Sequence, residues 1–150
     1  MKICIGGTFN QLHKGHKLII SKAFEYAGID GTVFIGLAIG NLIKNKKNVK
    51  SFETRKNQLN RYMIKEGFNN QAVIVPIKNK YGLTLEKDFD AIVISPETEK
   101  TAKLINQKRL FKGKKPLKII KIPFVLAEDG KPISSTRINK KEIDENGRLL

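Results

Sequence analysis

Short apolar runs alternate with amphipathic segments along most of this chain. The apolar runs cover residues 2–6, 31–39, 72–77, 89–95 and 117–126, and the amphipathic segments cover 14–27, 52–67, 96–110 and a C-terminal stretch from 133. Strand-length runs with little polar interruption are typical of parallel strands buried on both faces. Strands that alternate with helices build an α/β structure. The sequence therefore predicts a Rossmann-like, doubly wound fold with a five-stranded, mostly parallel sheet and helices on both faces.

Prolines and helical periodicity refine this expectation. Pro76 indicates that its strand ends there or lies at an edge, because proline donates no ladder hydrogen bond. Pro123 interrupts the last apolar run, and the serines that follow it can cap a C-terminal helix over residues 133–146. For the helix over 14–27, the spacing predicts an inward face made of Leu18, Ile19, Ala23 and Tyr26.

The length and the single cysteine limit the class of protein. At 150 residues the chain suits one domain, residues 1–150, with a core of its own. Cys4 has no partner for an internal disulfide, which favours a reducing, cytoplasmic setting. No run of about 18 apolar residues predicts a membrane span, and the N-terminus lacks the features of a signal peptide.

The formal net charge of +15 has two interpretations. A basic surface can bind nucleic acid or another polyanion. Nucleic-acid sites, however, usually cluster arginines and interleave aromatic residues, whereas the lysines here are scattered through every segment. We therefore favour a solvated lysine-rich surface, with part of the charge serving a small ligand rich in phosphate.

Both histidines of the chain lie in the stretch GGTFNQLHKGH, residues 6–16, directly after the first predicted strand. In doubly wound sheets, ligands bind at this end of the strands, near a topological switch point. Glycines permit a tight turn and a close approach to a ligand, and the N-terminus of the following helix favours an anion. His13 and His16 can add imidazole hydrogen bonds, and Gly15 leaves space between them. The stretch therefore predicts a phosphate site.

Other interpretations of this stretch are weaker. A metal site needs a third and usually a fourth ligand. The chain has no further histidine, Cys4 is expected in the strand, and no carboxylate is near in sequence, so no metal ligand is predicted. The histidines could instead serve only as local helix caps. The P-loop pattern and the G-x-G-x-x-G pattern are both absent.

The stretch resembles the first signature of the HIGH-type nucleotidyltransferase superfamily. The match consists of Gly7, Thr8, Phe9, His13, Gly15 and His16. The second signature of that superfamily is similar to ISSTRI, residues 133–138. Two motifs in the right order, at opposite ends of a chain of the right size, are far more specific than either one.

Within the superfamily the chain resembles the archaeal and eukaryotic-type phosphopantetheine adenylyltransferases. The likeness also includes GLAIGNLIKNKK, FETRKNQL, ISPETEKTAKLINQKR and DGKPISSTRI, and so spans most of the chain. It implies transfer of AMP from ATP, with Mg²⁺, to 4′-phosphopantetheine, which gives dephospho-CoA and pyrophosphate in coenzyme A synthesis. Two departures affect groups expected to place Mg²⁺ and substrate. Asn10 replaces the usual aspartate, and residues 38–40 read A-I-G instead of T-S-D.

The resemblance also implies roles for single residues. His16 would hold the α-phosphate in the transition state, Thr8 would contact the bridging region or the acceptor, and Lys44 would reach the reacting phosphate from its loop. ATP would be held by Gly7, His13, Gly15, Ser134, Ser135, Thr136, Arg55 and Arg109. Arg137 would add a charge or point to solvent, and Glu97 and Thr98 would lie near the adenosine.

Alternative functions exist both within the superfamily and outside it. FAD synthetases and nicotinamide mononucleotide adenylyltransferases share the first motif, although the latter usually begin G-R-F-x-P, unlike GTFNQ here. Cytidylyltransferases typically end in R-T-x-G-I-S-T-T, which KPISSTRI does not match. A basic nucleic-acid-binding module is an alternative of a different class. The sequence leaves the oligomeric state open.

Overall fold

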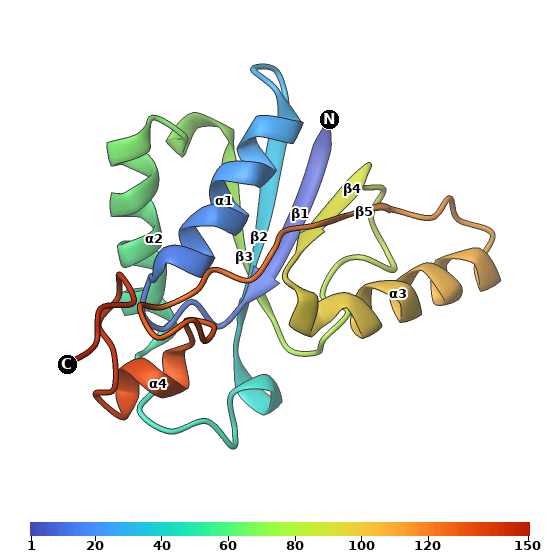
Figure 1. Ribbon diagram of the computed structural model, residues 1–150. Coiled ribbons are helices and arrows are strands. Elements are labelled where there is room, and N and C mark those ends of the chain that lie inside the picture. Colours follow the sequence, from blue (N-terminus) through green and yellow to red (C-terminus); the bar gives the residue numbers. More distant parts are fainter.

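The computed structural model describes residues 1–150 and contains one five-stranded sheet (Figure 1). The strands are β1 (Lys2–Gly7), β2 (Thr32–Ala38), β3 (Ala72–Ile77), β4 (Ala91–Ile94) and β5 (Lys118–Lys121). Their order is β3-β2-β1-β4-β5, and all four pairings are parallel. Pro76 lies in an edge strand, as predicted.

Four α-helices follow or connect these strands. They are α1 (Lys14–Ala27), α2 (Phe52–Glu66), α3 (Glu99–Phe111) and the short α4 (Ser135–Asn139). Three 3₁₀ turns complete the regular structure, namely η1 (Gly40–Leu42), η2 (Asn69–Gln71) and η3 (Pro96–Thr98). Ser51 caps α2 by accepting from the Thr54 N–H at 3.1 Å, and Gly67 ends it in the left-handed conformation.

The helices cover both faces of the sheet, as predicted for a doubly wound fold (Figure 1). On one face, α1 and α2 pack on the sheet through the main core, to which they contribute Ile20, Phe24, Leu59 and Met63. On the other face, Ile105 of α3 packs in a smaller cluster with Cys4, Phe89 and Leu117. No helix of the structure is long and apolar enough to cross a membrane.

Cys4 points into this smaller cluster and is 5% exposed. Its Sγ lies 3.7 Å from the carbonyl oxygen of Ala91 in the neighbouring strand. Burial raises the pKa of the Cys4 thiol to about 12. The side chain therefore behaves as a small apolar group of the core.

The strand order places a topological switch point between β1 and β4. The chain leaves β1 towards α1 on one face, and leaves β4 towards α3 on the other. The segments that follow these two strands therefore diverge and open a crevice at their carboxyl ends. The loop after β2 and helix α4 lie at this same end of the sheet (Figure 1).

Three sequence-based details were wrong. In α1, Ala23 is buried as predicted, and Leu18 and Ile19 are partly buried against the core. Tyr26, however, is 39% exposed, and Ile20, Phe24 and Ala27 are buried instead. The last strand stops at Lys121, after which Pro123 can donate no ladder hydrogen bond. Helix α4 ends at Asn139, because Lys141 has a positive φ of 60°.

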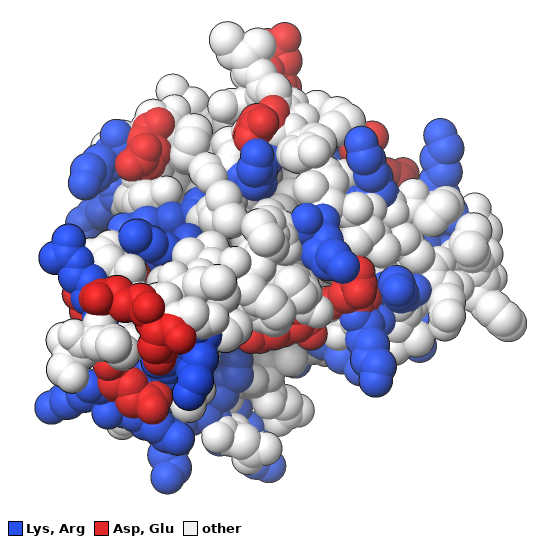
Figure 2. Space-filling model, in the orientation of Figure 1, with Lys and Arg blue, Asp and Glu red and all other residues white.

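Lysine and arginine side chains are spread over the face shown in Figure 2, with acidic side chains between them. Among the ion pairs, Lys121 and Glu99 lie 3.0 Å apart, and Lys22 and Glu25 lie 3.1 Å apart. The basic side chains on this face do not form one continuous surface. This distribution fits the interpretation of a solvated lysine-rich surface.

Candidate nucleotide-binding site

The side chain of His13 caps helix α1. Its Nδ1 accepts from the backbone N–H of Gly15 at 3.0 Å and of His16 at 3.4 Å. Because Nδ1 is an acceptor, the ring proton is on Nε2, which is left to donate to a ligand. The local-cap interpretation of His13 is therefore correct as far as Nδ1 is concerned, and the other nitrogen remains available.

This cap corrects one expectation about α1. We expected its N-terminus to offer free backbone N–H groups to a phosphate. The structure shows the N–H groups of Gly15 and His16 bonded to His13, and that of Lys14 bonded to the Glu145 carbonyl at 3.2 Å. The first turn of α1 therefore has these donors occupied, and an anion there meets the imidazole of His13 instead.

His16 stacks on His13 with 3.7 Å between the ring centroids and 19° between the planes. Its Nδ1 lies 2.9 Å from the carbonyl oxygen of Gln11, which fixes the orientation of the ring. Burial lowers the pKa of His13 to about 4. Burial, with His13 and Lys46 nearby, lowers that of His16 to about 3. Both rings are therefore neutral at pH 7 in the free protein.

Two glycines of the motif leave space for neighbouring rings, Gly15 for His13 and Gly7 for Phe9. A Cβ atom on Gly15 would lie 2.9 Å from Cε1 of His13, and one on Gly7 would lie 3.1 Å from the ring of Phe9. Phe9 is 1% exposed and has a positive φ of 48°, which is uncommon for a bulky residue. The tight turn after β1 is thus held by packing, and it aims both histidines at the crevice.

Helix α4 faces the histidines across the crevice. Ser134 caps it by accepting from the N–H of Arg137 at 3.2 Å. The N–H groups of Ser135 and Thr136 have no protein acceptor, as expected in the first turn of a helix. With the two hydroxyl groups, they form the set of free donors that we had expected from α1.

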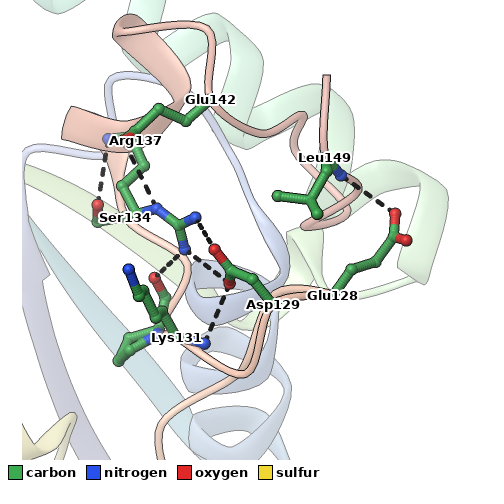
Figure 3. Close-up of polar contacts among 8 residues, drawn as sticks. Glu128, Asp129, Lys131, Ser134, Arg137, Glu142 and Leu149 are labelled. Carbon is green, nitrogen blue, oxygen red and sulfur yellow. Dashed lines mark hydrogen bonds and ion pairs between the residues drawn. The ribbon is translucent and has the colours of Figure 1, made fainter.

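Arg137 points neither into the crevice nor to solvent (Figure 3). Its guanidinium forms an ion pair with Asp129, donates to the Pro132 carbonyl at 3.3 Å, and lies 3.6 Å from Glu142. The hydrogen bond from Arg137 lowers the pKa of Asp129. Arg137 therefore holds the loop before α4 to the residues after it.

The histidines and the first turn of α4 line one cavity of about 300 Å³. It brings together seven of the predicted residues, namely Thr8, His13, Gly15, His16, Ser134, Ser135 and Thr136. A second cavity of about 260 Å³ lies beside it and includes Gly7. The two cavities share Thr8, Ile19, Lys46 and Ser95.

Lys46, and not Lys44, lies at this junction. The Nζ of Lys46 donates to Oγ1 of Thr8 at 2.6 Å, and Lys46 lines both cavities, whereas Lys44 lines neither. The loop turns after η1, where the N–H of Lys46 bonds to the Ile43 carbonyl at 3.1 Å, and Lys46 lies at the cavities in place of the predicted Lys44. The sequence offered four lysines in this loop and no signal for choosing among them.

Arg55 and Arg109 do not line either cavity, contrary to expectation. Both are 1% exposed, and their guanidinium groups donate to backbone carbonyls. Arg55 bonds to Thr8, Ala38 and Lys50, and Arg109 to Thr84, Lys87 and Lys115. Burial lowers the pKa of Arg55. Each residue holds the backbone together, and neither is free to hold a nucleotide.

Several lining residues were not assigned a firm role from the sequence. Glu97 lines the first cavity, and Thr98 lines the second. Phe124 lines the first cavity and is 45% exposed, so part of its ring is open to a ligand. An aromatic residue directly after Pro123, where the apolar run is interrupted, was the available signal in the sequence. No group of three His, Cys, Asp or Glu side chains is arranged to hold a metal ion.

Comparison with known proteins agrees with this geometry. The sequence model of the Cytidylyltransferase-like family matches residues 4–141. The phosphopantetheine adenylyltransferase of Methanosarcina mazei is 46% identical over 99% of this chain and 96% of its own. That of Archaeoglobus fulgidus is 43% identical over the full length of both chains. A crystal structure of an Archaeoglobus fulgidus protein of unknown function, 38% identical, superimposes with a TM-score of 0.74 and covers 81% of this chain and 89% of that one.

Proposed function

Because the chain belongs to the Cytidylyltransferase-like family, we propose that it transfers the adenylyl group of ATP to 4′-phosphopantetheine, giving dephospho-CoA and pyrophosphate. The Methanosarcina mazei and Archaeoglobus fulgidus relatives named phosphopantetheine adenylyltransferase match this chain over nearly its whole length. The structural observation that supports it best is the pair of adjoining cavities that meet at Thr8 and Lys46. A two-substrate transfer needs two such spaces with the reacting atoms at their junction.

The chemistry requires little from the protein beyond position and charge. The phosphate monoester of the acceptor is largely ionised at pH 7, so its oxygen needs no general base. A bond forms between this oxygen and the α-phosphorus of ATP, the bond to the bridging oxygen breaks, and pyrophosphate leaves with the electron pair. Such displacements depend mainly on alignment and on stabilising the spreading negative charge.

The first cavity suits ATP. The triphosphate would lie between the Nε2 donor of His13 and the free N–H groups at the start of α4. A helix N-terminus with hydroxyl side chains is a frequent phosphate site. The apolar side chains of Ile122 and Phe124 offer a surface for the adenine base. His16 would face the α-phosphate, as the sequence motif predicts.

The second cavity suits the pantetheine arm. Its walls are largely apolar, with Ile77, Ile92 and Ile105 among them, and hydroxyl groups of α3 and η3 at one side. The acceptor phosphate would then lie at Thr8 and Lys46, where a cation and a hydroxyl meet. Lys46 would neutralise charge on both the acceptor and the α-phosphate, because it lines both cavities.

We propose that Mg²⁺ enters with ATP. Glu97 is the only carboxylate that lines the first cavity, and the amide of Asn10 is bonded to the backbone of residues 48 and 50. The cavity thus offers few oxygen ligands of its own. Mg²⁺ typically uses substrate phosphates and water together with one or two protein ligands, and this donor set fits that pattern. Bound with ATP, Mg²⁺ would neutralise phosphate charge.

The test is pyrophosphate release with MgATP and one acceptor at a time, using 4′-phosphopantetheine, FMN, nicotinamide mononucleotide and glycerol 3-phosphate. Release with 4′-phosphopantetheine alone is the expected result. Release with another acceptor alone would keep nucleotidyl transfer and overturn the proposed acceptor. No release with any acceptor, together with salt-resistant binding of DNA or RNA at about 0.15 M salt, would favour the nucleic-acid-binding alternative.

A further inference from the structure

The loop that carries Lys46 has little regular structure of its own. It runs from Ala38 at the end of β2 to Ser51 at the cap of α2 and contains one 3₁₀ turn, η1, near its start. A long side chain on such a loop loses conformational freedom when it is held at Thr8. How often the ammonium group of Lys46 lies at the junction therefore depends on what fixes the loop.

Asn10 fixes the far end of this loop. Its Oδ1 accepts from the N–H of Lys50 at 2.7 Å, and its Nδ2 donates to the carbonyl of Asn48 at 3.0 Å. Asn10 is 6% exposed and lies in the turn after β1, two residues from Thr8. Asn48 has a positive φ of 58°, a left-handed conformation that asparagine adopts more readily than most residues, and the amide of Asn10 holds the backbone in it.

Arg55 fixes the same turn to the base of the loop. It donates to the carbonyls of Lys50 at 2.8 Å, Ala38 at 2.8 Å and Thr8 at 3.0 Å. The start and the end of the loop are thus tied to the turn that carries Thr8. Lys46 lies between these two ties, and no other hydrogen bond of a loop side chain reaches the turn.

We propose that Asn10 is a positioning residue for the transfer reaction, and that its amide holds residues 48–50 so that the ammonium of Lys46 stays at Thr8. The proposal rests on the proposed function, because the rate it concerns is that of adenylyl transfer. Asn10 lies at the edge of a further cavity of about 590 Å³ that Thr8 and Lys46 also line. Both ends of its amide are bonded to the loop backbone, so we infer that it acts on the reaction through Lys46.

Both ends of the amide contribute to this role. A carboxylate at residue 10 would still accept from the N–H of Lys50, but it would place an oxygen 3.0 Å from the carbonyl of Asn48, with no hydrogen between them. A leucine of similar size would remove both hydrogen bonds. Asparagine at residue 10 therefore makes two hydrogen bonds to the loop, aspartate would make one, and leucine would make none.

The experiment is a double-mutant cycle between Asn10→Leu and Lys46→Ala, with pyrophosphate release in the presence of MgATP and 4′-phosphopantetheine as the readout. We expect N10L alone to lower kcat about tenfold to a hundredfold, since a small misplacement of a catalytic group has effects of that size. N10D should fall between N10L and wild type. In the K46A background, N10L should lower kcat less than about twofold further, because residues that act as a unit are not additive.

Asn106 provides a matched control on the other side of the molecule. Its Nδ2 donates to the carbonyl of Leu117 at 2.9 Å, and its Oδ1 accepts from the N–H of the same residue at 2.7 Å. It therefore makes the same pair of backbone bonds as Asn10, away from both cavities. Asn106→Leu should leave kcat within about twofold of wild type, measured on protein shown to be folded by circular dichroism.

The outcomes separate this proposal from the proposed function. An inactive wild type would overturn the function and with it this inference. An active wild type in which N10L and K46A multiply their separate effects would overturn the positioning role alone. Hydrogen exchange provides a measurement that does not depend on activity. Exchange of the Lys50 amide should speed up at least tenfold in N10L while the amides of β1 keep their wild-type rates, and unchanged exchange at Lys50 would contradict the proposal.

Discussion

Arg55 in α2 and Arg109 in α3 are held in nearly the same way on the two faces of the sheet. Each is 1% exposed, and each donates from Nε to one carbonyl at 2.8 Å and from Nη1 to two others. Each also has an asparagine nearby whose amide makes two bonds to the backbone. Asn10 holds residues 48 and 50, and Asn106 holds Leu117.

The two regions differ in what they hold together. Arg55 ties the turn after β1 to the loop after β2, and both of these line the cavities. Arg109 ties Thr84 and Lys87, between β3 and β4, to Lys115 before β5, and none of these three residues lines either cavity. The same chemical arrangement should therefore affect both stability and activity in one place, and stability alone in the other.

The largest effect is expected from Arg55→Met. The substitution leaves the carbonyls of Thr8, Ala38 and Lys50 without their donor, although it also removes a buried charge. We expect the free energy of unfolding to fall by about 3 kcal/mol and kcat/KM to fall more than about a hundredfold. Urea unfolding and pyrophosphate release measure the two quantities. Normal activity in a destabilised variant would show that Arg55, like Arg109, affects stability alone.

Arg109→Met should match this loss of stability without the loss of activity. The three carbonyls that lose their donor are those of Thr84, Lys87 and Lys115. A drop of about 3 kcal/mol in the free energy of unfolding is expected for the same chemical reason. At a temperature where the variant is fully folded, its kcat/KM should stay within about threefold of wild type. A hundredfold loss would mean that Arg109 has a role in the site after all.

His16→Ala is expected to show the reverse pattern. We expect turnover to fall at least about a hundredfold, which is the scale for the loss of one group that stabilises a developing oxyanion. Because Nδ1 of His16 lies at the Gln11 carbonyl, Nε2 donates to the phosphate only when the ring is protonated, a state that the negative charge of bound ATP favours. The free energy of unfolding should change by less than about 1.5 kcal/mol, because the ring makes one 2.9 Å contact with the Gln11 carbonyl, one long 3.4 Å contact with the His13 N–H and one stacking contact with His13. Steady-state kinetics with a matched unfolding curve provide the check, and near-normal turnover would remove His16 from the mechanism.

The smallest effect concerns pH and His13. Burial lowers its pKa to about 4 in the folded protein from a usual value of 6.5, so the unfolded chain binds more protons between these two values. Stability is therefore fully present above pH 6.5 and declines as the pH falls towards 4. Because one pKa unit is worth about 1.4 kcal/mol and the ring partly faces the cavity, we expect a decline of about 2 kcal/mol.

His13→Asn isolates this contribution, because asparagine can cap α1 in place of His13 but does not titrate. The difference in unfolding free energy between wild type and variant should change across pH 6.5 to 4 and stay constant above pH 7. A difference that does not vary with pH would mean that His13 has the same pKa in the folded and the unfolded chain. Such a result would contradict the lowered pKa that burial of the ring gives His13.

The sequence was sufficient for the order of the elements and for the place of the site. Apolar runs of strand length, the prolines and the motif at residues 6–16 depend on local preferences. The crossover rules reduce the possible sheet orders to a few once the strands are known, and the order itself comes from the structure. The seven residues that meet in the first cavity come from the two motifs, whose relation to each other is set by this topology.

The sequence was not sufficient where hydrogen bonds between distant segments decide the outcome. Nothing local to Arg55 or Arg109 indicates that carbonyls from other segments surround them, so both were assigned to ATP. Lys44 and Lys46 have the same chemistry, and only the turn after η1 separates them. His13 fits both a cap and a ligand contact, and the structure shows the cap at Nδ1, which leaves Nε2 free.

Burial of Cys4 determines how this protein can be handled with a thiol substrate. The substrate proposed here ends in a free thiol, and a protein thiol in reach could be lost to a mixed disulfide with it. With a pKa of about 12, Cys4 is about one part in ten thousand thiolate at pH 8, and it is 5% exposed. A colorimetric thiol reagent added to the native protein would therefore report the substrate thiol alone, and oxidation in storage would deplete the substrate before it affected the enzyme.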